Sequence, residues 1–210
     1  MVMAVALTLL TGYLLGNLNG AVSMSILLGK DDIRNHGSGN AGLTNFMRRF
    51  GPSSGLLVVA IDVFKTVLAC LVGKSLLLPH GLAFEGLMLG AVAVTLGHDF
   101  PALLGFKGGK GVLCGVSIAL LADWRCGLLV LAVFALGLWL TRYVSLSSIL
   151  GALTFIISFG ILHRQTPFAA VMGILLGLWI VFMHRSNIQR LIKGTEKKAT
   201  FSQFRKKNKA

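Results

Sequence analysis

Glycine, asparagine, histidine and cationic residues gather in three short stretches of an otherwise apolar chain. The stretches cover residues 36–50, 97–111 and 184–196. Glycine lets the backbone approach a ligand closely, asparagine and serine offer hydrogen bonds, and arginine and lysine add positive charge. This combination predicts a site for an anionic, phosphorylated ligand.

The middle stretch places the loop F-K-G-G-K-G, residues 106–111, directly before an apolar segment. We expect its consecutive amides to point inward and the start of the next helix to add partial positive charge. The loop is not a Walker A sequence, because Gly111 stands where a magnesium-binding serine or threonine belongs and the glycine spacing is one residue short. A plain turn is the alternative. The predicted phosphate-binding residues are Lys107, Gly108, Gly109, Lys110 and Gly111.

The first stretch, G-S-G-N-A-G-L-T-N-F-M-R-R, predicts a second amide-lined cradle. In it, Arg48 is suited to hold a phosphate through two parallel hydrogen bonds. The alternative is a turn followed by an N-capped helix whose arginines only set the membrane topology. The other residues predicted to contact substrate here are Gly37, Ser38, Gly39, Asn40, Thr44 and Asn45.

The last stretch begins with His184 and Asn187. A histidine can orient or deprotonate a hydroxyl group, and an asparagine can bind one. Glu196 lies among lysines and an arginine, which favours an ion-pairing or capping role over a catalytic one.

Asp62 and Lys65 stand one helical turn apart inside an apolar run, so they can pair on one face. Ionisable groups at membrane depth are expensive, and such a pair must therefore face the helix bundle or a wet cavity. Two interpretations stay open: a contact that packs helices, or a part of the site.

The elements that position these residues must lie in a membrane. The chain has 210 residues, 55% of them apolar, and a mean hydropathy of +0.79, which does not suit a soluble domain of this size. We predict one integral membrane domain over residues 1–198 and a basic cytoplasmic tail over 199–210. The three cysteines, Cys70, Cys114 and Cys126, are predicted to be core residues.

Apolar segments predict an all-α bundle of seven transmembrane helices with short cytoplasmic loops that form the site. The first segment is long enough to break near residues 16–20, where Asn17 and Asn19 should face protein. The segment 112–122 is short, so a re-entrant loop is its alternative. The predicted spans cover residues 2–29, 53–73, 82–97, 112–122, 127–141, 146–162 and 167–183.

Charge placement favours seven crossings. With that number, sixteen of the twenty lysines and arginines share one side, which the positive-inside rule makes cytoplasmic. All three polar stretches then lie on that face and can form one site. A net charge of +13 also suits nucleic acid, but the cations are split among membrane loops and the tail. We therefore predict anionic membrane lipids, and no nucleic acid, as partners.

Taken in order, the three stretches resemble the signature motifs of the bacterial acyl-phosphate:glycerol-3-phosphate acyltransferases, the PlsY family. The resemblance extends to the D-x-x-K helix at residues 62–65 and to T-R-Y-V-S-L-S-S-I at 141–149. Leu43, the pair Leu113 and Cys114, and the sequence at 17–19 depart from the family pattern. By motif, the resemblance implies active-site roles for Ser38, Arg48, His184 and Asn187, a phosphate loop at Lys107, Gly108, Gly109 and Gly111, and a structural Glu196.

The resemblance implies an enzyme of the bacterial inner membrane, with its active site facing the cytosol, that begins phospholipid synthesis. It would move a fatty acyl group from acyl phosphate to the 1-hydroxyl of glycerol 3-phosphate, giving lysophosphatidic acid and phosphate. No cofactor or metal is expected. The H-x-x-x-x-D signature of thioester-using acyltransferases is absent.

Acyl phosphate is a mixed anhydride with a good leaving group, so no covalent protein intermediate is needed. The reaction needs two phosphates held close, an aligned hydroxyl and a proton acceptor. The acceptor is either His184 or a phosphate of the substrates. The alternative function is a small organophosphate or anion transporter, although the sequence shows no internal repeat of the kind many transporters have.

Overall fold

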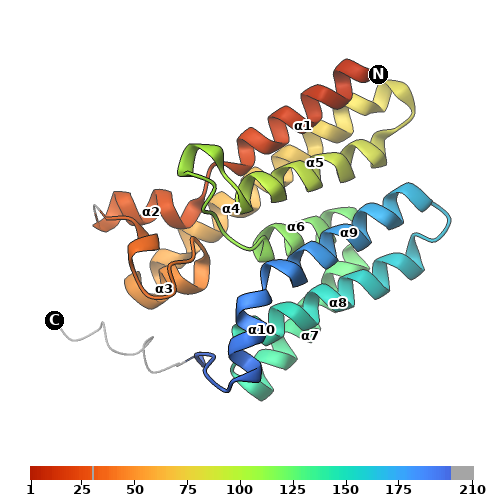
Figure 1. Ribbon diagram of the computed structural model, residues 1–210. Helices are drawn as coiled ribbons and strands as arrows, with labels where there is room; N and C mark the ends of the chain where they lie inside the picture. The colour runs from red at the N-terminus through yellow and green to blue at the C-terminus, as the bar shows by residue number, and fades with distance from the viewer. Residues whose placement is uncertain (30, 200–210) are drawn as a thin grey trace.

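A computed structural model describes residues 1–29 and 31–199, and the predicted tail at 199–210 lies almost wholly outside them (Figure 1). The described residues form helices and no strands. The α-helices are α1 (Val2–Gly16), α2 (Gly20–Gly29), α3 (Leu43–Phe50), α4 (Pro52–Leu77), α5 (Ala83–Asp99), α6 (Val112–Ala122), α7 (Trp124–Thr141), α8 (Val144–Leu162), α9 (Pro167–Met183) and α10 (Arg185–Ile192). Short 3-10 helices are η1 (Ile33–Asn35), η2 (Leu78–His80) and η3 (Ala102–Leu104).

The long helices pack in two neighbouring groups. One group contains α1, α4 and α5, and the other contains α6, α7, α8 and α9 (Figure 1). Glycines let the backbones of the first group touch: a Cβ added at Gly16 would lie 2.7 Å from the Cα of Gly97. Small residues at helix crossings are the usual means of packing helices in lipid, where water does not drive association.

Five helical segments are long and apolar enough to cross a membrane, and the bent pair of α9 and α10 adds a sixth. Helix α6 has 11 residues, which is short for a crossing. The protein is therefore an all-helical, multi-pass membrane protein. The predicted apolar segments all form helices, but the structure supports five to six spans and not the full seven that the sequence predicts.

The predicted break in the first span is confirmed, because α1 ends at Gly16 and α2 begins at Gly20. Asn17 accepts a hydrogen bond from the Leu103 amide through Oδ1 at 3.0 Å. Asn19 donates through Nδ2 to the Ala41 carbonyl at 3.1 Å. Both asparagines are buried in protein, as expected. Through these two hydrogen bonds, the break in the first span is attached to the loop that follows α2 and to the loop that follows α5.

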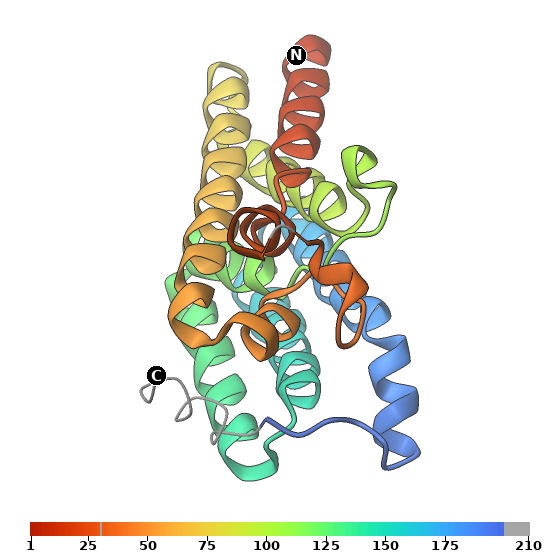
Figure 2. The ribbon, with the colours of Figure 1, turned by 90° about the vertical axis from the view of Figure 1, so that its left-hand side faces the viewer.

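The three polar stretches lie at one end of the molecule. In Figure 1, α2, α3 and the loop before α6 lie toward the left and α10 lies at the lower centre, whereas the N-terminus and the α4–α5 and α8–α9 turns lie on the right. Figure 2 views this end directly, with α2 and α3 in front. The prediction that the stretches share one face is confirmed. The three cysteines are free and buried, as predicted.

Candidate active site

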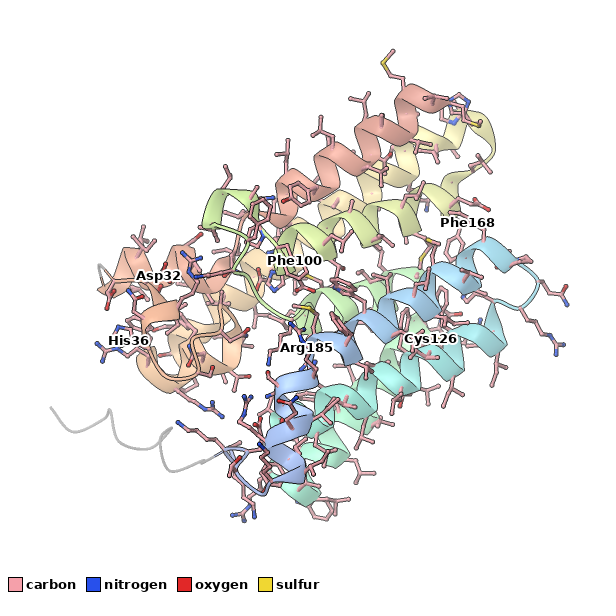
Figure 3. The ribbon with its side chains drawn as sticks, viewed as in Figure 1. Asp32, His36, Phe100, Cys126, Phe168 and Arg185 are labelled. Carbon is pink, nitrogen blue, oxygen red and sulfur yellow. The ribbon has the colours of Figure 1, made fainter. Side chains whose placement is uncertain are left out.

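Arg34, in η1 just before the first polar stretch, holds this part of the chain against the second stretch. Its Nη1 atom donates to the carbonyl oxygens of Leu104 at 2.5 Å and Lys107 at 3.1 Å. Asp32 holds the guanidinium in place with an ion pair of 2.7 Å. Asp32 and His36 lie together at this end of the molecule (Figure 3). No motif marks Arg34 in the sequence, because motif spacing does not show which residue will bridge two loops.

Lys110 joins the second stretch to the third. Its ammonium donates to Oδ1 of Asn187, a side chain that is itself buried. The Asn187 Nδ2 group donates in turn to Oε1 of Glu196 at 2.7 Å, and Arg190 donates to Oε2 at 2.6 Å. Residues separated by more than 70 positions in the sequence thus form one polar cluster.

The glycine-rich loop is built differently from the sequence expectation. The amide of Gly108 donates to the Asp99 carbonyl at 3.1 Å, and that of Gly109 donates to the His98 carbonyl at 3.0 Å. These two amides therefore fold the loop back onto the end of α5, and the expectation that they point toward a ligand is wrong. Gly109 packs against the His98 ring, where a side chain would clash. The positive end of α6 and Lys110 are the groups left to attract an anion.

Asn45 organises the first stretch. Its Oδ1 atom accepts from the Ser38 amide at 3.1 Å, and its Nδ2 group contacts the carbonyls of His36 at 2.9 Å and Asn40 at 3.1 Å. With its amide hydrogens used by the backbone, Asn45 shapes the loop and does not offer them to a substrate. Gly37 and Gly39 adopt positive φ angles of 61° and 72°, a region that favours glycine.

Arg48 and Ser38 are exposed beside this loop. Within residues 1–29 and 31–199, Arg48 makes no side-chain hydrogen bond or ion pair, so its guanidinium is available for a ligand. The neighbouring Arg49 instead lies over the Phe50 ring, 5.8 Å from its centre. The two adjacent arginines thus differ: Arg49 is stacked on a ring, whereas Arg48 has no side-chain partner in the described part of the chain.

His184 is oriented by the helix that precedes it. Its Nδ1 atom lies 2.7 Å from the Ile180 carbonyl oxygen. A carbonyl oxygen only accepts hydrogen bonds, so the neutral ring carries its proton on Nδ1 and keeps a lone pair on Nε2. This tautomer can receive a proton, as a general base requires.

Asp62 and Lys65 form a buried pair of 2.7 Å, and Lys65 also donates to the Leu18 carbonyl at 2.5 Å. The Lys65 ammonium lies 2.8 Å from Nδ1 of His98, the residue whose carbonyl anchors the glycine loop. The pair therefore connects α4 to the break in the first span and to the end of α5. It supports the polar loops indirectly, through the break in the first span and through His98. Sequence reasoning gave His98 no role, although it lies inside the second stretch.

Burial and the charged neighbours of Lys110 determine the pKa of its ammonium group. Burial, Arg190 and Arg185 lower the pKa of Lys110, whereas Glu196 and Asp99 raise it, and the net result is a pKa of about 8. Arg185 stands at the start of α10 on the side of the cluster (Figure 3). Lys110 is thus close to half-charged at a mildly alkaline pH.

We expect kcat/KM for a phosphorylated substrate to fall as the pH rises through about 8, because the ammonium form of Lys110 binds the anion and is lost above its pKa. Lys110→Arg keeps its charge and should move this decline above pH 10 or so. Initial rates from about pH 6 to 10 measure both curves. An unchanged alkaline decline in Lys110→Arg would assign it to another group.

The fold and the site define a multi-pass helical membrane protein with a cationic site at one end, which suits an anionic ligand. Residues 6–194 match the family described as glycerol-3-phosphate acyltransferase. The glycerol-3-phosphate acyltransferase of Thermoanaerobacter pseudethanolicus is 40% identical over 93% of this chain and 96% of its own length. That of Finegoldia magna is 39% identical over 89% and 91%.

Two crystal structures of PlsY, an integral membrane glycerol 3-phosphate acyltransferase, are also similar. The glycerol 3-phosphate form has a TM-score of 0.86 and 29% identity, covering 97% of this chain and 99% of the other. The lysophosphatidic acid form has a TM-score of 0.79 and 30% identity, covering 95% and 97%. The chain belongs to the glycerol-3-phosphate acyltransferase (PlsY) family, and the resemblance seen in its sequence is confirmed. It is a membrane acyltransferase of phospholipid biosynthesis.

Proposed function

We propose that this enzyme transfers a fatty acyl group from acyl phosphate to the sn-1 hydroxyl of glycerol 3-phosphate. The products are lysophosphatidic acid and phosphate. The observation that carries the proposal is the position of the Lys110 cluster directly beside an apolar groove. A donor with a phosphate head and a hydrocarbon chain fits these two neighbouring environments.

The groove is narrow and apolar, and it is lined by side chains of α6, α7, α8 and α9. It begins at Val112, the residue after the glycine loop, and reaches Phe155 in the hydrophobic core. Ile180 lines the groove and also accepts the hydrogen bond from His184, so the groove opens next to the proposed proton acceptor. Burying the hydrocarbon there is favourable by about 0.8 kcal/mol for each CH₂ group.

In the proposed reaction, Arg48 and Lys110 hold the two phosphates against their mutual repulsion. The glycerol hydroxyl oxygen attacks the acyl carbonyl carbon, the bond from that carbon to the phosphate oxygen breaks, and phosphate leaves with the electron pair. Holding the reactants together supplies much of the rate enhancement. The hydroxyl proton goes to Nε2 of His184 or to a phosphate oxygen of the substrates.

We further propose that α6 completes a seventh crossing and that the site faces the cytosol from the bacterial inner membrane. The concentration of basic residues at the end that holds the site supports this orientation. Glycerol 3-phosphate would then enter from water, and the acyl chain from the bilayer.

Purified enzyme incubated with acyl phosphate and glycerol 3-phosphate is expected to form lysophosphatidic acid and phosphate in equal amounts. Acyl thioesters serve as the comparison donor and should give no product. Uptake of glycerol 3-phosphate into proteoliposomes without a donor is the measurement that tests the transporter alternative. Product formed from thioesters alone, or uptake without acyl transfer, would refute the proposal.

A further inference from the structure

The turn between α7 and α8 holds the segment that follows α10 at three places. The amide of Ala199 donates to the Arg142 carbonyl at 2.7 Å, and the Lys198 ammonium lies 5.4 Å from the centre of the Tyr143 ring. Ser145, in the first turn of α8, donates through Oγ to Oε1 of Glu196 at 2.7 Å. This turn belongs to the sequence T-R-Y-V-S-L-S-S-I, to which neither the motif analysis nor the proposed reaction gives a role.

Glu196 is held by three donors from two helices, one donor on α8 and two on α10. Its Oε1 atom accepts from Ser145 and from Asn187, and its Oε2 atom accepts from Arg190. Burial alone would raise the pKa of Glu196, but these three hydrogen bonds lower it below its ordinary value. Glu196 therefore remains a carboxylate that can only accept hydrogen bonds.

A fixed acceptor at this place determines which way the Asn187 amide points. Since Glu196 requires the NH₂ group, the amide oxygen must face the other way, toward the Lys110 ammonium. A reversed amide would turn its NH₂ group against the ammonium and lose both contacts. The orientation of Asn187 thus depends on where Glu196 is held.

We propose that Ser145 is a positioning residue for the acyltransferase reaction, which fixes Glu196 so that Asn187 presents its amide oxygen to Lys110. The inference rests on the proposed function of this site. Among the described residues, Ser145 makes no hydrogen bond to Lys110 or Asn187, so its effect is transmitted through the carboxylate. Its side chain is buried with 7% exposure, which leaves Glu196 as its partner in place of water.

The test compares Ser145→Ala with Ser145→Thr, which retains the hydroxyl, and with Ser147→Ala. Ser147 is the matched control, because among the described residues its hydroxyl donates to the carbonyl of Tyr143, the N-cap of the same helix, and not to Glu196. We expect Ser145→Ala to lower kcat/KM about tenfold, which corresponds to about 1.4 kcal/mol, close to the contribution of a weak hydrogen bond to a charged group. Ser145→Thr and Ser147→Ala should stay within about twofold of wild type.

Two further readouts separate positioning from a general loss of structure. In an Asn187→Ala background, Ser145→Ala should add little to the defect, because the two residues act in one chain of contacts. The alkaline decline of kcat/KM in Ser145→Ala should also move to lower pH. Glu196 is the nearby group that raises the pKa of Lys110 most. When Glu196 is displaced, burial, Arg190 and Arg185 still lower that pKa and only Asp99 is left to raise it, so the pKa falls.

Equal effects of Ser145→Ala and Ser147→Ala, or additive effects of Ser145→Ala and Asn187→Ala, would overturn the inference while leaving the proposed function intact. Wild-type enzyme that forms no lysophosphatidic acid would instead refute the proposed function, and the inference would fall with it. A thermal unfolding midpoint for Ser145→Ala that lies well below that of Ser147→Ala, with no change in the pH profile, would also reject positioning in favour of a stabilising role.

Discussion

Lys110→Met is expected to lower kcat/KM for glycerol 3-phosphate by about 100- to 1,000-fold, the loss typical of removing one preorganised charged donor from an active site. Methionine has nearly the same length and volume as lysine but carries no charge. Lys110 contacts Asn187 and lies beside the positive end of α6, where the second and third polar stretches meet. Rates of lysophosphatidic acid formation by the purified variant measure the effect.

Lys74→Met is the matched control for this experiment. Lys74 is exposed in the last turn of α4, at the end of the molecule opposite the site, so its loss should leave kcat/KM unchanged. If Lys110→Met kept more than about a tenth of wild-type activity, Lys110 would not be a main phosphate ligand.

Lys65→Met is expected to destabilise the protein by about 3 kcal/mol, because it leaves the buried Asp62 carboxylate without its partner. The Lys65 side chain is fully buried and joins Asp62, the Leu18 carbonyl and His98. The midpoint of thermal unfolding in detergent should fall by several degrees. Activity measured well below that midpoint should fall less than in Lys110→Met.

The double variant Asp62→Asn with Lys65→Met tests the reason for this loss. Removing both charges should recover part of the stability, since the uncompensated carboxylate is then gone. A double variant less stable than Lys65→Met alone would show that Asp62 has an independent role, such as accepting from the Gly20 amide at 3.2 Å.

The helical segments could be predicted because their signals are local. A run of about 20 apolar residues is sufficient to indicate a span, and the glycines and asparagines at residues 16–20 were sufficient to place the break in the first one. Helix α6 was harder to assign. Its 11 residues are apolar enough for a membrane but too few to cross it alone, so its role depends on what lies around it.

By itself, the sequence determined the class of protein, the helices, and the face on which its polar stretches lie, because apolar length and loop charge act along the chain. Only the tertiary structure decided which polar groups are free for a substrate. The amides of Gly108 and Gly109 and the side chain of Asn45 have the right chemistry, yet the backbone already uses them. Arg34, His98 and Ser145 meet partners at least 33 residues away in sequence. Hydrogen-bond partners are set by where the folded chain returns in space, and motif spacing does not contain that information.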